Sequence, residues 1–218
     1  MTTPSPLSQD KVHLWLLEHR QTDGHMLSQE ERLRSARYRT EVVRERFLFT
    51  QTAKREILGH YLNQPPQEIL FQTNEYGKPF VDGLEFSISH TDGMSLLALS
   101  ELSPVGIDIE LLTPQPDLDL LLTRICSPSE KEEFKALTEA QKLKAFYRLW
   151  TAKEAYLKNL GIGFKVDPQA VESNFPALTL LQALDLPQLQ LLEVDISPDF
   201  IAHLASKQRD IKHSLFRF

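Results

Sequence analysis

The chain has 218 residues, of which 41% are hydrophobic and 25% are charged, and its formal net charge is −6. These proportions are those of an ordinary globular protein, and the acidic balance argues against a protein that binds nucleic acid by neutralising phosphates. A single cysteine, Cys126, excludes an internal disulfide. Because no apolar run is long enough to span a bilayer and the start shows no signal-peptide pattern, we expect a cytoplasmic protein without membrane contact.

The first half of the chain predicts strands around two helices. The S-x-x-E pattern from Ser28 to Glu31 is typical of a capping box at a helix start, and Pro65 and Pro66 prevent a later helix from continuing. Alternation of apolar and polar residues from Leu84 onward indicates a half-buried strand. In chain order, we expect a strand over 12–17, helices over 28–38 and 41–62, and strands over 84–89, 94–100 and 105–110.

The second half repeats a similar order of elements. An apolar stretch over 118–125 leads to Ser127, which opens a helix, and Gly161 is the residue type that ends a helix in the left-handed conformation. The further expected elements are a long helix over 139–160 and strands over 189–194 and 200–205. The sequence therefore predicts an α+β fold of two similar lobes, residues 1–103 and 104–218.

Two acids interrupt a strand that otherwise looks buried, at residues 106–110 with the sequence GIDIE. Side chains alternate across a strand, so Asp108 and Glu110 share one face and the two isoleucines occupy the other. Two carboxylates about 4 Å apart repel by about 4 kcal/mol at an effective dielectric of roughly 20, more than the about 1.5–3 kcal/mol gained by burying one isoleucine. Either this acidic face lies in water or a cation binds there. An antiparallel meander would bring Ser89 and His90 beside the two acids.

A second pair of charged residues lies on the long predicted helix. Glu154 and Lys158 are four residues apart and therefore share one helix face. Alone, such a pair is typical of a surface ion pair worth about 0.2–1 kcal/mol. Together with Asp108 and Glu110, Glu154 completes a set of three carboxylates, which suits Mg²⁺, and the lysine suits a phosphate charge.

With these residues the chain resembles a known family. GIDIE and WTAKEAYLK, residues 150–158, look like the paired signature of the 4′-phosphopantetheinyl transferases of the surfactin-synthetase-activating (Sfp) type. LSQEERLRSARY, NEYGKPF and FSISHTDG resemble the other blocks of that family in the same order, so the resemblance covers residues 27–163. It implies a pseudo-dimeric fold of two α/β lobes in one chain, and therefore a monomer.

By this resemblance, the chain transfers the 4′-phosphopantetheine arm of coenzyme A to a serine of an apo acyl, peptidyl or polyketide carrier protein and releases 3′,5′-ADP. The resemblance implies that Asp108, Glu110 and Glu154 hold Mg²⁺ on the pyrophosphate and that Lys158 contacts phosphate oxygens. Residue chemistry agrees, since attack on a pyrophosphate needs its charge neutralised and its oxygens held in line. Glu154 is the preferred acceptor of the serine proton, directly or through water, and Glu130 is an alternative.

The coenzyme A contacts are carried over position by position from the resemblance. Besides Asp108 and Lys158, they are Gly77 and Lys78 at the nucleotide end, Ser89 and His90 at the 3′-phosphate, and the basic residue Arg34. The first lobe therefore carries the nucleotide contacts, and the second carries the metal site and the carrier-protein docking surface. Other residues have structural readings: Arg32, Arg37 and Arg46 as a solvated or inter-helix charge pattern, Trp150 and Tyr156 as core, and Lys153 as a support for its neighbour Glu154.

A docking surface is expected directly after GIDIE. Carrier proteins are acidic, as is this chain, so docking needs a local apolar patch with a basic rim. The stretch that offers one contains Leu118, Leu120, Leu121, Leu122, Arg124 and Ile125. The alternative reading of this stretch is a short amphipathic helix that faces the core.

Two other functions use similar residues. A Mg²⁺-dependent nuclease also clusters acids, but its common pattern wants a lysine two residues after the second acid, where this chain has Leu112. A non-catalytic module that binds coenzyme A or a carrier protein has no need of three metal ligands. The sequence therefore favours the transferase over both.

Overall fold

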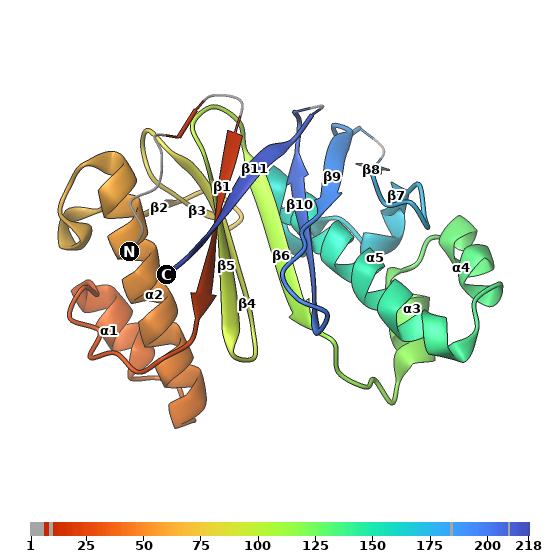
Figure 1. Ribbon diagram of the computed structural model, residues 1–218, viewed down its shortest axis with the longest axis horizontal. Coiled ribbons are helices and arrows are strands. Elements are labelled where there is room, and N and C mark those ends of the chain that lie inside the picture. Colours follow the sequence, from red (N-terminus) through yellow and green to blue (C-terminus); the bar gives the residue numbers. More distant parts are fainter. Residues whose placement is uncertain (1–6, 9–10, 184, 209) are drawn as a thin grey trace.

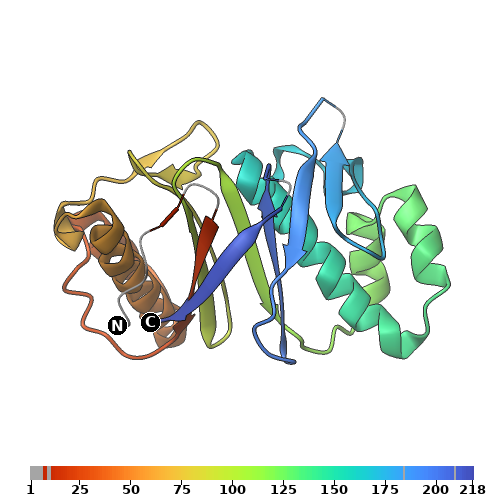
Figure 2. The same cartoon turned by 45° about the horizontal axis from the view of Figure 1, so that its top comes forward.

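The computed structural model describes residues 7–8, 11–183, 185–208 and 210–218. Its helices and strands agree with the predicted α+β class. Two sheets pack face to face between two helical layers: α2 (Glu41–Leu62) covers the outer face of one sheet and α5 (Glu139–Leu160) that of the other (Figures 1 and 2).

Shorter elements surround this framework. The other helices are α1 (Gln29–Ser35), α3 (Leu118–Ile125) and α4 (Pro128–Lys135), with 3₁₀ turns at Pro66–Glu68, Gly163–Lys165 and Pro168–Ala170. The strands are β1 (Lys11–Glu18), β2 (Gln72–Thr73), β3 (Pro79–Phe80), β4 (Glu85–Thr91), β5 (Met94–Ser100), β6 (Val105–Leu111), β7 (Val171–Ser173), β8 (Leu180–Ala183), β9 (Leu189–Glu193), β10 (Phe200–Ser206) and β11 (Lys212–Arg217).

Local signals explain where the helices begin and end. Ser28 caps α1 and Ser127 caps α4, each through a reciprocal capping box with the glutamate three residues later. The predicted bounds of α2 and α5 are confirmed, and α5 stops where Gly161 takes a φ of 69°. α1 ends at Ser35, before the predicted residue 38, because the amides of Arg37 and Tyr38 donate to carbonyls only three residues back. Among the described residues, no helix is long and apolar enough to cross a membrane.

The two sheets draw strands from both ends of the chain. The first has the order β11-β1-β5-β4 and the second has the order β6-β10-β9-β8-β7. β11, the last strand of the chain, pairs in parallel with β1, with Lys212 opposite Lys11 and Arg217 opposite Leu16. The C-terminal strand thus completes the sheet of the first half. The division between residues 1–103 and 104–218 stays a prediction.

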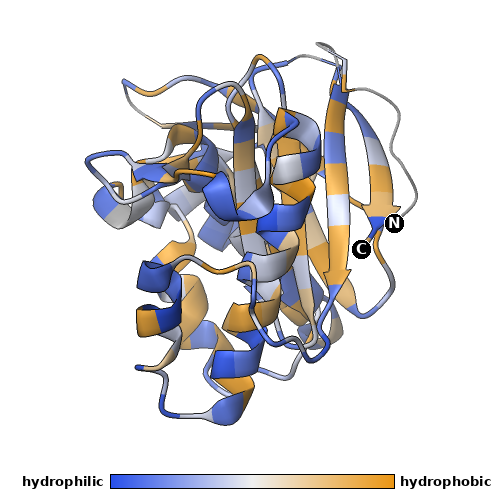
Figure 3. Ribbon diagram, turned by 90° about the vertical axis from the view of Figure 1, so that its left-hand side faces the viewer, coloured by the Kyte–Doolittle hydropathy of each residue, from blue (hydrophilic) through white to orange (hydrophobic). Residues whose placement is uncertain are grey.

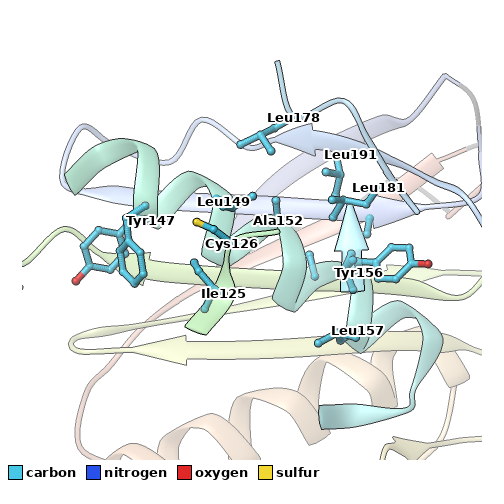
Figure 4. Close-up of a cluster of buried hydrophobic side chains, with 14 of the residues drawn as sticks. Ile125, Cys126, Tyr147, Leu149, Ala152, Tyr156, Leu157, Leu178, Leu181 and Leu191 are labelled. Atoms are coloured by element: carbon cyan, nitrogen blue, oxygen red, sulfur yellow. The ribbon is translucent and has the colours of Figure 1, made fainter. Parts of the chain in front are cut away.

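The strands carry many hydrophobic residues (Figure 3). Successive side chains of a strand point to opposite faces, and both faces of the central strands are buried, so three apolar clusters separate the layers. Leu14 belongs with Ile107 to the cluster between the two sheets, whereas Trp15, one residue later, belongs to the cluster under α2. The cluster between α5 and the second sheet contains Tyr156 and Leu191 (Figure 4). Tyr156 is fully buried, as predicted.

The strands β4 and β6 lie side by side as edge strands of the two sheets, and we call this strip the seam. The predicted meander of β4, β5 and β6 is wrong, because β6 pairs with β10 in the second sheet. Hydroxyl groups replace a backbone ladder across the seam. Ser87 Oγ accepts from Ile107 N at 3.1 Å, and Thr91 Oγ1 accepts from Leu111 N at 3.1 Å. The polar face predicted for β4 therefore meets β6 instead of water.

The apolar stretch after β6 forms α3, which faces the core. Leu122 and Ile125 are buried, and Leu118 and Leu121 pack against the same cluster, while Leu120 is 52% exposed. Leu122 and Ile125 are therefore too buried to belong to the predicted docking patch. The stretch is a short amphipathic helix on the core, as the alternative reading says, and docking at the other leucines stays a prediction.

Candidate active site

Gly106 lets β6 and α5 approach more closely than a side chain would allow. A Cβ atom at this position would lie 1.9 Å from the carbonyl oxygen of Ala155 and 2.4 Å from the amide nitrogen of Asn159. The buried side chain of Asn159 fixes the contact further, since it donates to the carbonyl oxygens of Pro104 at 2.6 Å and Ala205 at 3.0 Å. The face of α5 that carries Glu154 and Lys158 therefore lies directly against β6.

Asp108 is the centre of a set of polar contacts at the seam. It is 3% exposed, and its Oδ1 accepts from Ser89 Oγ and from Lys158 Nζ, both at 2.6 Å. Lys158 Nζ also donates to Ser89 Oγ at 2.8 Å. The expected proximity of Ser89 to Asp108 is confirmed, although the neighbouring strands belong to different sheets. The acidic side chain lies inside the protein, against a cation from α5.

A cavity of about 530 Å³, here called the seam cavity, opens over these contacts. Residues of α1 and α2 form its opposite wall, where the guanidinium of Arg34 lies 5.3 Å from the ring centre of Phe47. The cavity brings together seven residues that the sequence proposes for the site: Arg34, Ser89, His90, Asp108, Glu110, Glu154 and Lys158. Both halves of the chain therefore contribute to one hollow.

Glu110 and Glu154 have raised pKa values in this cavity. Burial raises the pKa of Glu154 to about 7, and the negative charge of Asp108 adds to the shift. Burial also raises the pKa of Glu110, again with a contribution from Asp108. Lys158 opposes the shift at both residues. The charge of Lys158 therefore does not cancel the effects of burial and of Asp108 on these two carboxyl groups.

Two buried carboxylate oxygens of the cavity, Asp108 Oδ2 and Glu154 Oε1, have no hydrogen-bond partner among the described residues. Buried polar atoms normally have a hydrogen-bond partner, so an unpaired one often marks the site of a ligand or an ion. Within the described part of the chain, no three His, Cys, Asp or Glu side chains are grouped as they would be around a metal ion. The oxygen-only donors, the unpaired atoms and the raised pKa values nevertheless fit the chemistry of a hard cation such as Mg²⁺.

A second cavity, of about 470 Å³, adjoins the first beside α3, and we call it the α3 cavity. The two share Arg46, His90, Glu110 and Trp150. The indole nitrogen of Trp150 lies 3.4 Å from Glu110 Oε1 and donates to it. Apart from Asp92, the rest of the lining is uncharged: Thr91, Leu111, Thr113, Gln115, Leu121, Ile125, Phe146 and Tyr147.

Gly77 and Lys78 lie outside the seam cavity, in a neighbouring one of about 270 Å³ that we call the hairpin cavity. It shares Ile88 and Lys158 with the seam cavity. Lys78 Nζ donates to the carbonyl oxygen of Asn159 at 3.2 Å, and burial lowers the pKa of this lysine. Gly77 and Lys78 therefore lie in a different cavity from the acids, and the two cavities have Ile88 and Lys158 in common.

Lys153 and Glu130 belong to a different buried network. Lys153 Nζ donates to Glu130 Oε2 at 2.6 Å and to two backbone carbonyls, and both side chains are 1% exposed. Glu130 Oε1 accepts from Ser173 Oγ at 2.6 Å. The expected support of Glu154 by Lys153 is wrong as a direct contact. Glu130 lines none of the three cavities, which weakens its candidacy as the proton acceptor.

Sequence reasoning missed two residues that line both large cavities, Arg46 and Trp150. Helical spacing was the signal for each. Trp150 precedes Glu154 and Lys158 by four and eight residues, so all three share one face of α5. Arg46 precedes Thr50 by four residues on α2, and both line the seam cavity. The side chain of Arg46 lies 3.3 Å from Asp92.

Comparison with known proteins gives a consistent result. The family model described as the 4′-phosphopantetheinyl transferase superfamily matches residues 104–199. The 4′-phosphopantetheinyl transferase HetI of Nostoc sp. is 37% identical over 169 residues, which cover 72% of this chain and 71% of that protein. A putative 4′-phosphopantetheinyl transferase of Synechocystis sp. is 34% identical over 63% of this chain and 58% of that protein. The 4′-phosphopantetheinyl transferase of Bacillus subtilis is 32% identical over 56% of this chain and 58% of its own length.

The raised pKa of Glu154 predicts a pH dependence of folding stability when no divalent cation is present. A carboxyl with a raised pKa holds its proton in the folded chain at pH values where the unfolded chain has lost it, so the free energy of unfolding falls as the pH rises toward 7. Glu154→Gln has no carboxyl at this position and so does not show this fall. Between pH 5 and pH 8, we expect the free energy of unfolding of the variant to rise by about 1–3 kcal/mol relative to that of the wild type.

Urea unfolding in a chelator at several pH values measures this difference, and Glu139→Gln, at the exposed start of the same helix, is the control. Parallel pH profiles for the wild type and Glu154→Gln would contradict the assignment of the shift to Glu154.

Proposed function

Because the chain belongs to the 4′-phosphopantetheinyl transferase superfamily, we propose that the seam cavity is where the phosphopantetheine arm of coenzyme A passes to a serine of a carrier protein. The reaction releases 3′,5′-ADP. The observation that carries the proposal is the convergence on one hollow of Asp108 and Glu110 from β6, Glu154 and Lys158 from α5, and His90 from β4. The alternative of a non-catalytic binding module gains no support from so acidic a cluster.

The enzyme is of the surfactin-synthetase-activating type and acts as a monomer with pseudo-dimeric lobes. Each half of the chain has a 22-residue helix packed on a sheet, α2 on the first and α5 on the second. The cavity takes Arg34 from the first half and Lys158 from the second. A single chain therefore supplies both walls of the site, with no need for a second subunit.

The cavities differ in charge in a way that suits the two ends of coenzyme A. Arg34, Arg46, His90 and Lys158 give the seam cavity several basic groups, which suit the phosphates of the nucleotide. The hairpin cavity beside it, with Gly77 and Lys78, receives the rest of the nucleotide. The mostly uncharged α3 cavity takes the neutral amide arm. The pyrophosphate then lies in the seam cavity near Glu110, where this cavity meets the α3 cavity.

Asp108, Glu110 and Glu154 are the residues that would hold Mg²⁺. Support comes from the unpaired Asp108 Oδ2 and Glu154 Oε1 and from the raised pKa of Glu154 and of Glu110. When bound, the ion supplies positive charge that stabilises the pyrophosphate as the bond to the leaving group breaks.

Protein side chains perform the remaining steps. Lys158, already in the cavity, donates to phosphate oxygens and offsets their charge. Glu154 takes the proton of the attacking serine hydroxyl, directly or through water, because its carboxylate lines the seam cavity one helical turn from Lys158. Glu130 is less suited to this role, because Lys153, Ser127 and Ser173 already occupy its oxygens. Coenzyme A and the carrier serine thus meet at the α5 face of the seam.

The first prediction from the proposed function concerns the transfer itself. An apo carrier protein incubated with the wild-type chain, coenzyme A and Mg²⁺ gains the mass of one phosphopantetheine group. Asp108→Asn keeps the shape of the side chain but removes its charge, so we expect the transfer rate to fall by about 10²-fold or more. Mass spectrometry of the carrier protein over time measures the mass gain with the wild type and the transfer rate of the variant.

The same variant separates the metal site from the fold. Saturating Mg²⁺ should raise the melting temperature of the wild type by several degrees and leave that of Asp108→Asn unchanged. No mass gain with the wild type would overturn the proposed function. Normal transfer by a folded Asp108→Asn variant would overturn the role of the carboxylates.

The second prediction concerns His90 and the 3′-phosphate. A hydrogen bond to a charged group contributes about 1.5–3 kcal/mol. His90→Ala should therefore lower the affinity for coenzyme A by roughly ten- to a hundredfold, and the affinity for dephospho-coenzyme A much less. Calorimetric titration of both ligands measures the difference. The control is His25→Ala, an exposed histidine that lines none of the cavities described. Equal losses for the two ligands would assign His90 another role.

A further inference from the structure

The last turn of α5 carries Lys158 and ends at the seam, where its backbone needs partners. The last carbonyl groups of a helix have no amide partner within the helix. One of these groups in α5, Asn159 O, accepts from Lys78 Nζ at 3.2 Å, and the carbonyl oxygen of the C-cap residue Gly161 accepts from Asn74 Nδ2 at 2.8 Å. Both donors lie more than 80 residues earlier in the chain. The end of the helix is thus capped by the other half of the chain.

Asn74 builds the hairpin that makes this cap. Its Oδ1 accepts from the backbone amides of Tyr76 at 3.0 Å and Lys78 at 2.9 Å, which closes the turn between β2 and β3. Its amide nitrogen is left free to reach across to Gly161. The fit is close, because a Cβ atom on Gly161 would lie 3.0 Å from Asn74 Nδ2 and 2.9 Å from Lys78 Cδ. One side chain therefore shapes the turn and holds the helix end.

The capped turn is the one that places Lys158. Lys158 Nζ reaches Asp108 and Ser89 from this turn. The side chain of its neighbour Asn159 donates to the carbonyl oxygen just before β6 and to one in β10. Loss of the cap would leave the carbonyls of the last turn exposed to competing water and let the turn fray. Lys158 would then lose part of its alignment with Asp108.

We propose that Asn74 is a positioning residue that acts through the last turn of α5, holding Lys158 in place for phosphoryl contact. The proposal rests on the proposed function for its kinetic consequence, but the cap itself is a separate structural claim. The hairpin cavity lies against the same turn, since Lys78, Gly161 and Lys158 all line it.

Asn74→Asp isolates the cap from the turn. Aspartate keeps an oxygen that accepts from the amides of Tyr76 and Lys78, but it loses the donor to Gly161 O. Asn74→Ala loses both functions. Glu75→Ala, an exposed change in the same turn, is the control. We expect both Asn74 variants to lower kcat about three- to tenfold, with KM for coenzyme A within about twofold of wild type after Asn74→Asp and with Glu75→Ala unchanged.

Hydrogen exchange provides a readout that needs no activity. Amides of residues 159–162 should exchange about threefold faster or more in both Asn74 variants, while amides at the start of α5 keep wild-type rates. Wild-type exchange and wild-type kcat in Asn74→Asp would overturn the proposal. A rise in KM for coenzyme A without a fall in kcat would also overturn it, because Asn74 would then act as a nucleotide contact. Faster exchange throughout the chain would overturn it as well, because Asn74 would then contribute only to the stability of the whole fold. A wild type that lacks transfer activity would instead defeat the proposed function and leave the exchange result to test the cap.

Discussion

The contact between Gly106 of β6 and the backbone of α5 is the constraint on which the site depends. An added Cβ atom would lie 1.9 Å from the carbonyl oxygen of Ala155, so every other residue type would push the helix away. The alternation along β6 then turns Asp108 and Glu110, as well as Gly106, toward the helix, and the apolar positions between them toward the other sheet. One glycine thus lets two acids of a strand and two charged residues of a helix occupy the same hollow.

The seam explains how two halves of the chain share one site. Backbone pairing between β4 and β6 would join the two sheets into one continuous sheet, without the seam at which the cavity opens. Hydroxyl groups on β4 instead satisfy amides and carboxylates of β6, as with Ser87 to Ile107 N and Ser89 to Asp108. The strands stay close while their sheets diverge, and α2 and α5 close the cavity from the two sides. Stability and function meet here, because Asp108 lies buried against Lys158, and burial raises the pKa values of Glu110 and Glu154.

Local signals in the sequence account for much of the fold, and non-local pairing accounts for what was missed. The bounds of α2 and α5 follow from caps, prolines and Gly161, which act within a few residues. The partner of β6 and the return of β11 to β1 depend on contacts between distant segments, for which no local pattern exists. Residue chemistry pointed to Asp108, Glu110, Glu154 and Lys158, and the resemblance to a known family added Arg34, Ser89 and His90. All seven line the seam cavity, while their roles stay predictions. Trp150 was assigned to the core since an indole on an apolar stripe fits either role, and it in fact touches both the core and Glu110.

The free energy of unfolding of Gly106→Ala tests most directly whether the close approach of β6 and α5 holds the site together. Gly93→Ala is the reference: its added Cβ meets no atom within 4 Å, so only the positive φ of 77° should cost stability, by about 1–2 kcal/mol. At Gly106 the added atom must displace the helix backbone, so urea unfolding should show a loss of about 3 kcal/mol or more. A Gly106→Ala variant as stable as Gly93→Ala would contradict the account.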